Sequence, residues 1–200
     1  HFVLPEAAGT PFDGLKVLDI GCGGGLISEP LTRLGAAVTG IDADARTIGT
    51  ARLHAEQTGL EIDYRVCLAE DLAAEMPGAF DAVIASEVIE HVADPALFAE
   101  SLAKLVRPGG AVFVTTLNRT MKSLLFGKFA AEYVLRWVPA GTHDWRQFLK
   151  PEELGALLTE AGLVLAEKTG IRFDPLGDSF ERSSDLGINY AMLAVRPEAA

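Results

Sequence analysis

The stretch that decides the fold class of this chain is Val17-Leu18-Asp19-Ile20-Gly21-Cys22-Gly23-Gly24-Gly25. An apolar run carrying one acidic residue breaks into glycines, and a helical pattern begins near Leu26. Glycines at such a turn let a ligand approach the bare amide groups of a helix N-terminus. The dinucleotide pattern G-x-G-x-x-G, counted from Gly21, would require a glycine where Leu26 stands. The observed spacing, D-x-G-x-G-x-G, therefore indicates a nucleotide-like ligand but not the loop of a dehydrogenase.

Composition limits the class of protein. The 200 residues are 49% hydrophobic, which suits one globular domain over residues 1–200. The formal net charge of −11 argues against nucleic acid as a partner, because clustered Lys and Arg hold phosphates. Cys22 and Cys67 match no metal or CxxC spacing, which favours a reduced cytosolic setting, and no apolar run approaches the roughly 20 residues of a membrane span. The chain opens at His1 without a signal-peptide pattern, which is typical of a fragment or a processed chain.

Short β-branched runs alternate with helical patterns along the chain, and this alternation predicts an α/β sheet with crossover helices. The seven predicted strands cover residues 16–20, 37–41, 62–66, 80–85, 111–116, 164–169 and 188–195. The predicted helices cover residues 26–34, 45–58, 95–105 and 151–161. Arg107-Pro108-Gly109-Gly110 predicts a turn before the fifth strand.

Residues 117–150 form an inserted segment longer than the usual connection. Within it, residues 122–138 have a helical pattern of their own, with charged and apolar positions at four-residue spacing. The charged stripe is Lys128, Glu132 and Arg136, and the apolar stripe is Leu125, Phe129 and Tyr133. Such a segment suits a lid over an active site, a helix lying in a membrane interface, or a helix packed on the core. Its local basic charge favours contact with anionic lipid, whereas the net charge of the chain opposes it.

The glycine loop resembles the cofactor loop of class I S-adenosylmethionine (AdoMet) methyltransferases. In that interpretation the cofactor lies against Gly21 and Gly23, outside the carboxyl ends of the strands. Asp42 ends the second strand, where a carboxylate can accept hydrogen bonds from both ribose hydroxyls. Asp19 either orients the loop or, through water, binds the ammonium of the methionine moiety.

Two further strand ends complete the predicted cofactor site. Ala69 and Glu70 follow the third strand, where a backbone amide and an acid could bind the adenine edge. Glu70 is equally an ordinary acidic residue in the first turn of a helix. Ser86 follows the fourth strand and would offer backbone groups to the cofactor. The alternative is a nucleotide-binding fold without retained activity.

The fourth strand leads into an acidic cluster with one histidine. Glu87, Glu90 and His91 stand at i, i+3 and i+4, so a helical turn would place them on one face. Two carboxylates and an imidazole could hold Mg²⁺, Mn²⁺ or Zn²⁺, and the cation could bind both oxygens of a catechol. Alternatively, His91 is a general base toward a phenol or has only an orienting or structural role.

Several blocks of sequence resemble the ubiquinone-biosynthesis O-methyltransferases, over residues from about 16 to 195. The blocks are Leu18-Asp19-Ile20-Gly21-Cys22-Gly23-Gly24-Gly25, Ser86-Glu87-Val88-Ile89-Glu90-His91-Val92-Ala93-Asp94-Pro95, Thr116-Leu117-Asn118-Arg119, Ala131-Glu132-Tyr133-Val134-Leu135-Arg136, Gly141-Thr142-His143-Asp144 and Ile188-Asn189-Tyr190. The first is shared by many methyltransferases, whereas the third, fourth and fifth are far more specific.

The resemblance implies a fold and an activity. The fold is a Rossmann-like, seven-stranded class I methyltransferase sheet, mostly parallel with an antiparallel last strand, and helices on both faces. The activity is methyl transfer from AdoMet to a phenolic hydroxyl of a polyprenylated catechol on the route to ubiquinone. The resemblance also implies peripheral membrane contact, here through residues 122–138. We accordingly expect a cytoplasmic protein at the inner membrane, or on the matrix side in a mitochondrion, and association with other quinone-biosynthesis enzymes.

The resemblance also assigns residues. It implies that Gly21, Asp42 and Ser86 line the AdoMet site, and that Glu87, Glu90 and His91 match the positions proposed to hold a divalent cation. The candidates for shaping the substrate pocket are Asn118, Arg119, His143 and Tyr190. Two alternatives remain open: a methyltransferase of this fold acting on another small molecule, and a non-catalytic module that binds AdoMet or lipid.

Overall fold

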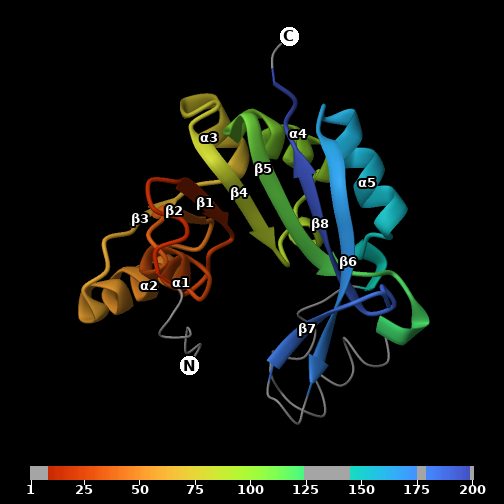
Figure 1. Ribbon diagram of the computed structural model, residues 1–200, viewed down its shortest axis with the longest axis horizontal. Coiled ribbons are helices and arrows are strands. Elements are labelled where there is room, and N and C mark those ends of the chain that lie inside the picture. The colour runs from red at the N-terminus through yellow and green to blue at the C-terminus, as the bar shows by residue number, and fades with distance from the viewer. Residues whose placement is uncertain (1–8, 124–144, 175–178, 199–200) are drawn as a thin grey trace.

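The computed structural model describes residues 9–123, 145–174 and 179–198. They form an eight-stranded sheet with the order β3-β2-β1-β4-β5-β8-β6-β7 (Figure 1). The strands are β1 (Lys16–Ile20), β2 (Ala37–Asp42), β3 (Asp63–Val66), β4 (Phe80–Ser86), β5 (Val106–Leu117), β6 (Val164–Asp174), β7 (Ser179–Ser183) and β8 (Asn189–Val195). The α-helices are α1 (Ser28–Arg33), α2 (Ala45–Thr58), α3 (Ala69–Glu75), α4 (Pro95–Leu105) and α5 (Pro151–Glu160), and two 3₁₀ turns are η1 (Ile89–His91) and η3 (Trp145–Gln147).

The pairing of the strands confirms the predicted Rossmann-like α/β architecture. Strands β3, β2, β1, β4 and β5 run parallel, and β8 lies antiparallel between β5 and β6. The prediction of seven strands is wrong, because β7 pairs antiparallel with β6 as an eighth strand. This strand, Ser-Phe-Glu-Arg-Ser, is exposed over most of its length, so it lacks the apolar positions by which a buried strand is recognised.

Helices cover both faces of the sheet, as predicted. On one face, Leu31 of α1 packs in a cluster with Val17, and Ile48 of α2 packs in another with Tyr64 of β3. On the opposite face, α3, α4 and α5 enclose the largest cluster, in which Phe98 of α4 is buried. In Figure 1 α4 lies behind β5 and β8, α5 lies at the right beside β6, and the carboxyl ends of β4 and β5 point toward the lower edge.

Most element boundaries agree with the predicted ranges. Helices α2 and α4 each begin after an aspartate that caps the helix N-terminus. The side chain of Asp44 accepts a hydrogen bond from the backbone N–H of Arg46, and that of Asp94 accepts hydrogen bonds from the backbone N–H groups of Ala96 and Leu97. Helix α1 is shorter than the predicted 26–34, and α3 is absent from the predicted ranges, although a first helical turn was the alternative interpretation of Glu70.

The predicted turn at residues 107–110 lies inside β5 as an irregularity. The pairing of β4 with β5 shifts from Phe80–Val106 to Ala82–Ala111, so the extra residues stand out from the ladder. The prediction of a turn before the strand is therefore wrong: β5 begins at Val106 and carries residues 107–110 as an irregularity in its pairing.

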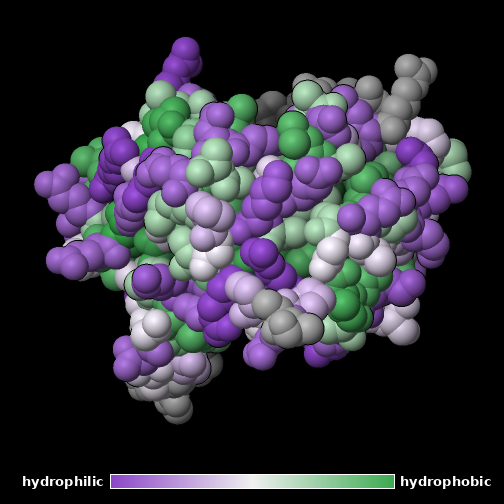
Figure 2. Space-filling model, turned by 90° about the horizontal axis from the view of Figure 1, so that it is seen from above, coloured by the Kyte–Doolittle hydropathy of each residue, from purple (hydrophilic) through white to green (hydrophobic). Residues whose placement is uncertain are grey.

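The amino-terminal edge of the parallel strands is a mixed polar surface. Seen from above, hydrophilic side chains spread over this edge with smaller hydrophobic areas between them (Figure 2). Within the described residues, no helix is long and apolar enough to cross a membrane.

Candidate functional site

A cavity of about 700 Å³ lies at the carboxyl ends of β1, β2 and β4. Its wall includes Gly21, Asp42, Ala69, Glu70, Glu87 and His91. Residues predicted from the glycine loop, from two strand ends and from the acidic cluster therefore share one cavity. This is the edge of an open α/β sheet at which ligands bind.

The glycine loop closes one side of the cavity with backbone that only glycine adopts without strain. Gly21 and Gly23 have φ of +67° and +54°. A Cβ at Gly21 would collide with Val88, which also lines the cavity. A side chain at this position would therefore both strain the turn and push the loop away from the segment after β4.

Asp42 is held in place by two backbone amides. The N–H of Gly23 donates to Asp42 Oδ2 over 3.1 Å, and the N–H of Asp44 donates to Oδ1 over 2.9 Å. Each carboxylate oxygen has a second lone pair, so the side chain can still accept hydrogen bonds from a ligand. This geometry suits the predicted contact with ribose hydroxyls.

Asp19 points away from solvent and binds within the protein. Its side chain is 1% exposed, and Ser28 Oγ donates to Asp19 Oδ2 over 2.6 Å. Burial raises the pKa of Asp19 to about 6, against the lowering effect of the Ser28 hydrogen bonds. This hydrogen bond joins the end of β1 to the first residue of α1, an arrangement compatible with the predicted orientation of the loop.

Ala69 and Glu70 lie in the first turn of α3, at the wall of the cavity. Ser86 ends β4, and its hydroxyl lies 2.9 Å from the hydroxyl of Thr115 on β5. Ser86 is not among the residues that line the cavity, and the predicted contact of its backbone with a cofactor stays a prediction.

The carboxyl groups of Glu87 and Glu90 come together, whereas His91 does not join them. The expectation that one helical face would carry all three is wrong: Glu87 has a φ of +55°, and η1 is a 3₁₀ turn. Glu87 stands before this turn with a left-handed backbone, so the three side chains do not follow the spacing of one helical face. Glu90 is 2% exposed, but His91 is exposed.

The carboxyl pair is anchored by two threonines at the end of β5. Thr115 Oγ1 donates to Glu87 Oε1, and Thr116 Oγ1 donates to Glu90 Oε2, each over 2.9 Å. Burial and the adjacent carboxylate of Glu90 raise the pKa of Glu87. Glu90 Oε1 is buried and accepts no hydrogen bond from the described residues.

These observations bear on the predicted metal site. Within the described residues, no three His, Cys, Asp or Glu side chains are grouped closely enough to hold an ion. The three-residue site expected at Glu87, Glu90 and His91 is therefore not assembled. The pair of carboxylates still offers oxygen ligands, the type preferred by Mg²⁺, which usually binds one or two carboxylates and keeps its other positions for water or substrate.

Three predicted substrate residues are described, and each binds within the protein. Asn118 Nδ2 donates to the carbonyl oxygen of Leu186 over 2.8 Å, and Arg119 forms an ion pair with Glu153 of α5. Tyr190 is fully buried, and its hydroxyl donates to the carbonyl oxygen of Leu149.

The fourth substrate candidate, His143, and residues 124–138 of the insert lie outside the described residues.

Sequence reasoning missed part of the wall. Val88, Leu97 and Phe98 line the cavity, and Thr115 and Thr116 anchor the carboxyl pair. The two threonines carried a signal, since they are adjacent polar residues closing an apolar strand at the carboxyl edge. The three apolar residues carried no such signal, because an apolar residue that lines a cavity has the same sequence pattern as one in the core.

Comparison with known proteins decides the family. A model of the methyltransferase domain matches residues 3–168. The ubiquinone biosynthesis O-methyltransferase of Caulobacter vibrioides is 56% identical over 98% of this chain and 78% of its own length. The protein of the same name from Brucella anthropi is 52% identical over 95% of this chain and 76% of its own length. This chain belongs to the ubiquinone biosynthesis O-methyltransferases.

The predicted activity class, AdoMet-dependent O-methyl transfer, is thereby confirmed for this O-methyltransferase. Solved structures agree on its fold. A SAM-dependent methyltransferase of Methanosarcina mazei superposes with a TM-score of 0.70 at 19% identity, covering 94% of both chains. The magnesium protoporphyrin IX methyltransferase of Synechocystis PCC 6803, solved with bound SAH, gives 0.68 at 21% identity, covering 93% of this chain and 76% of that one.

Proposed function

We propose that this O-methyltransferase transfers the methyl group of AdoMet to a phenolic hydroxyl of a polyprenylated catechol in ubiquinone biosynthesis. The observation that carries the proposal is the shared cavity of about 700 Å³, which joins the glycine loop to the acidic cluster. The names of the relatives support the pathway, and the chemistry of the cluster supports a phenolic acceptor.

The donor half of the site comprises the glycine loop, Asp42 and the start of α3. Asp42 would accept hydrogen bonds from the ribose, since the N–H groups of Gly23 and Asp44 already orient its carboxylate. Ala69 and Glu70 would border the adenine. The sulfonium of AdoMet is already activated, so the protein mainly aligns donor and acceptor and excludes water.

The acceptor half is the carboxyl pair of Glu87 and Glu90. A free phenol, with a pKa near ~10 by analogy with tyrosine, must lose its proton as its oxygen attacks the methyl carbon. A carboxylate whose pKa is raised accepts that proton more readily than an ordinary one, and Glu87 is such a group. The new O–C bond forms as the S–C bond breaks, and the proton passes to the pair.

A divalent cation at this place is the finer part of the proposal. Glu87 and Glu90 would hold it, because Glu90 Oε1 is buried without a hydrogen-bond donor among the described residues. When bound, such a cation would supply Lewis-acid activation of the catechol oxygens. His91, at the cavity wall, would then orient the substrate; without a cation it is the second candidate for the general base.

We propose in addition that residues 122–138 contact the membrane, where a polyprenyl tail resides. The support is the sequence alone: aromatic and apolar positions alternate with a locally basic stripe. On this basis the protein would be cytoplasmic and peripheral at the inner membrane, in reach of other enzymes that act on the same lipid-linked intermediates.

The test of the proposed reaction is transfer of labelled methyl from AdoMet to a short-chain prenyl catechol. Wild type should label the catechol, and Glu87→Gln/Glu90→Gln should lose at least about 100-fold in kcat, in line with the loss of general-base catalysis. Glu160→Gln, at the exposed end of α5, is the matched control and should behave as wild type. AdoMet binding without transfer by wild type would favour the non-catalytic alternative.

Chelation separates the two proton-transfer schemes. Activity that disappears with EDTA and returns with Mg²⁺ would support the cation, whereas unchanged activity after thorough chelation would eliminate it.

Liposome flotation tests the membrane contact: Phe126→Asp/Trp137→Asp should float less than wild type, and equal flotation would contradict the contact.

A further inference from the structure

We infer that Tyr64 is a positioning residue for the cofactor loop, which it holds from beneath through Gly25 and through a Ser28–Asp19 pair. The inference rests on the proposed placement of AdoMet against this loop. Tyr64 is on β3, two strands away from the loop, and no motif points to it. Two features support the inference: the register of β1, β2 and β3, and the space that Gly25 and Gly40 leave for the ring.

One row of residues crosses the sheet beneath the loop. Asp19 of β1 pairs with Gly40 of β2, and Gly40 pairs with Tyr64 of β3. A Cβ at Gly40 would lie 2.7 Å from two ring carbons of Tyr64 and 3.1 Å from Cys22 Sγ. The ring of Tyr64 therefore lies over Gly40, and a glycine is required in β2 so that the ring can pass toward β1.

The far end of the same ring reaches the glycine loop. A Cβ at Gly25, whose φ is +89°, would collide with the hydroxyl oxygen of Tyr64. Gly25 thus packs against the hydroxyl of Tyr64, and Gly40 packs against its ring carbons. At both positions a larger residue would collide with the side chain of Tyr64. The ring of Tyr64 therefore limits how far the loop can move toward the sheet at Gly25.

The hydroxyl of Tyr64 is buried at the centre of this arrangement. Tyr64 is 3% exposed, and within the described residues its hydroxyl completes no hydrogen bond of ordinary geometry. Ser28 lies close enough to lower the pKa of Tyr64, although burial is the larger effect and raises it to about 12. Ser28 in turn donates to Asp19, so the tyrosine lies against the loop at Gly25 and near Ser28, which binds the carboxylate at the end of β1.

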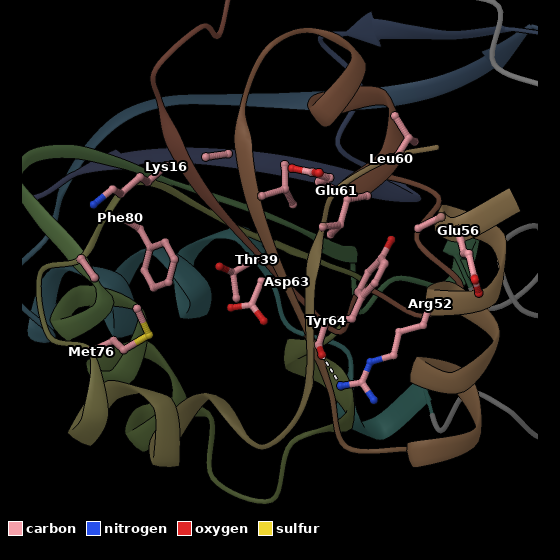
Figure 3. Close-up of a pocket in the computed structure, with 15 residues that line it drawn as sticks. Lys16, Thr39, Arg52, Glu56, Leu60, Glu61, Asp63, Tyr64, Met76 and Phe80 are labelled. Carbon is pink, nitrogen blue, oxygen red and sulfur yellow. Dashed lines mark hydrogen bonds between the residues drawn. The ribbon is translucent and has the colours of Figure 1, made fainter. Parts of the chain in front are cut away.

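The surroundings hold Tyr64 in this position. Arg52 of α2 donates to the backbone carbonyl oxygen of Tyr64, the bond drawn in Figure 3. Glu29, on the loop side, is buried and is bound by Arg33 and His54. Tyr64 is thus held at its backbone and contacts the glycine loop with its hydroxyl, so it is suited to fix the distance between that loop and the sheet.

The experiment compares Tyr64→Phe and Ser28→Ala with wild type in calorimetric titration with AdoMet and in unfolding. Removal of an unpaired buried hydroxyl should leave the melting temperature of Tyr64→Phe unchanged or higher. We expect its Kd for AdoMet nevertheless to rise about fivefold, because the oxygen against which Gly25 packs is gone and the loop is held less closely. The KM for AdoMet should rise equally, while kcat at saturating AdoMet stays near wild type.

Controls separate this inference from the proposed site. Ser101→Ala removes another buried serine hydroxyl, in α4 and away from the loop, and should leave the Kd unchanged. Asp42→Ala should weaken AdoMet binding if AdoMet lies where we propose, whatever the role of Tyr64. Wild-type affinity in both Tyr64→Phe and Ser28→Ala, with Asp42→Ala impaired, would overturn the role of Tyr64. Wild-type affinity in Asp42→Ala as well would overturn the placement of AdoMet.

Discussion

Gly21→Ala is the substitution that most directly probes the cavity wall. Gly21 has a φ of +67°, and a Cβ there would collide with Val88 Cγ2. The substitution therefore has two separate costs, one in the backbone and one in packing. Both fall between the cofactor loop and the segment that carries the acidic cluster.

The magnitude follows from these two observations. A non-glycine residue in the left-handed region costs about 1–2 kcal/mol. Forcing a methyl group against a packed side chain costs about 1–3 kcal/mol, because Val88 or the loop must move. Together they predict a loss of about 2–5 kcal/mol, which is a large fraction of the stability of a typical domain.

The assay is a double-mutant cycle in urea unfolding, with Gly21→Ala, Val88→Ala and the double variant. Val88→Ala removes the collision but leaves the backbone strain, so it should return about 1–3 kcal/mol of what Gly21→Ala loses. AdoMet titration should show weaker binding by Gly21→Ala and partial recovery in the double variant. Strictly additive losses would refute the contact between the loop and Val88.

Three further predictions concern the cluster and the substrate candidates. Burial and Glu90 raise the pKa of Glu87, so the native state keeps this proton to higher pH than the unfolded chain, and stability should fall as pH rises above the ordinary glutamate range; Glu87→Gln should flatten the pH dependence of the melting temperature, and an unchanged slope would contradict the raised pKa. Tyr190→Phe should cost about 1–2 kcal/mol in denaturant unfolding, since it removes a buried bond to Leu149, and a neutral effect would argue against that bond. Arg119→Ala should cost less than about 1 kcal/mol, because its ion pair with Glu153 is partly exposed, so a large loss of catechol turnover by this stable variant would indicate a substrate contact.

Much of the fold could be predicted because it depends on local patterns. The alternation of apolar strands and capped helices gave the order of the elements, and helices α2 and α4 begin and end where expected. Strand β7 was missed because its stability comes from pairing with β6 rather than from burial of its own side chains. Helix α3 was indicated only as an alternative for Glu70 and received no range, because it is short and follows a strand end interpreted as a ligand contact.

The site was predictable where residue type and strand end coincide. Gly21, Asp42 and Glu70 meet in one cavity because the carboxyl ends of parallel strands share an edge. The backbone after β4 was not predictable: the left-handed Glu87 and the 3₁₀ turn separate His91 from the carboxyl pair. The support beneath the loop was not predictable either, because the contact of Tyr64 with Gly25 depends on the register of three strands.

The most direct test of the account is a crystal structure of the full chain with S-adenosylhomocysteine. We predict that its ribose hydroxyls bind Asp42, that its sulfur lies over Gly21, and that the homocysteine side faces Glu87. A second cavity, of about 750 Å³, lies at the opposite edge of the sheet between Lys16, Phe80 and Glu61 (Figure 3). Binding of the cofactor product there, or away from Asp42, would contradict the account.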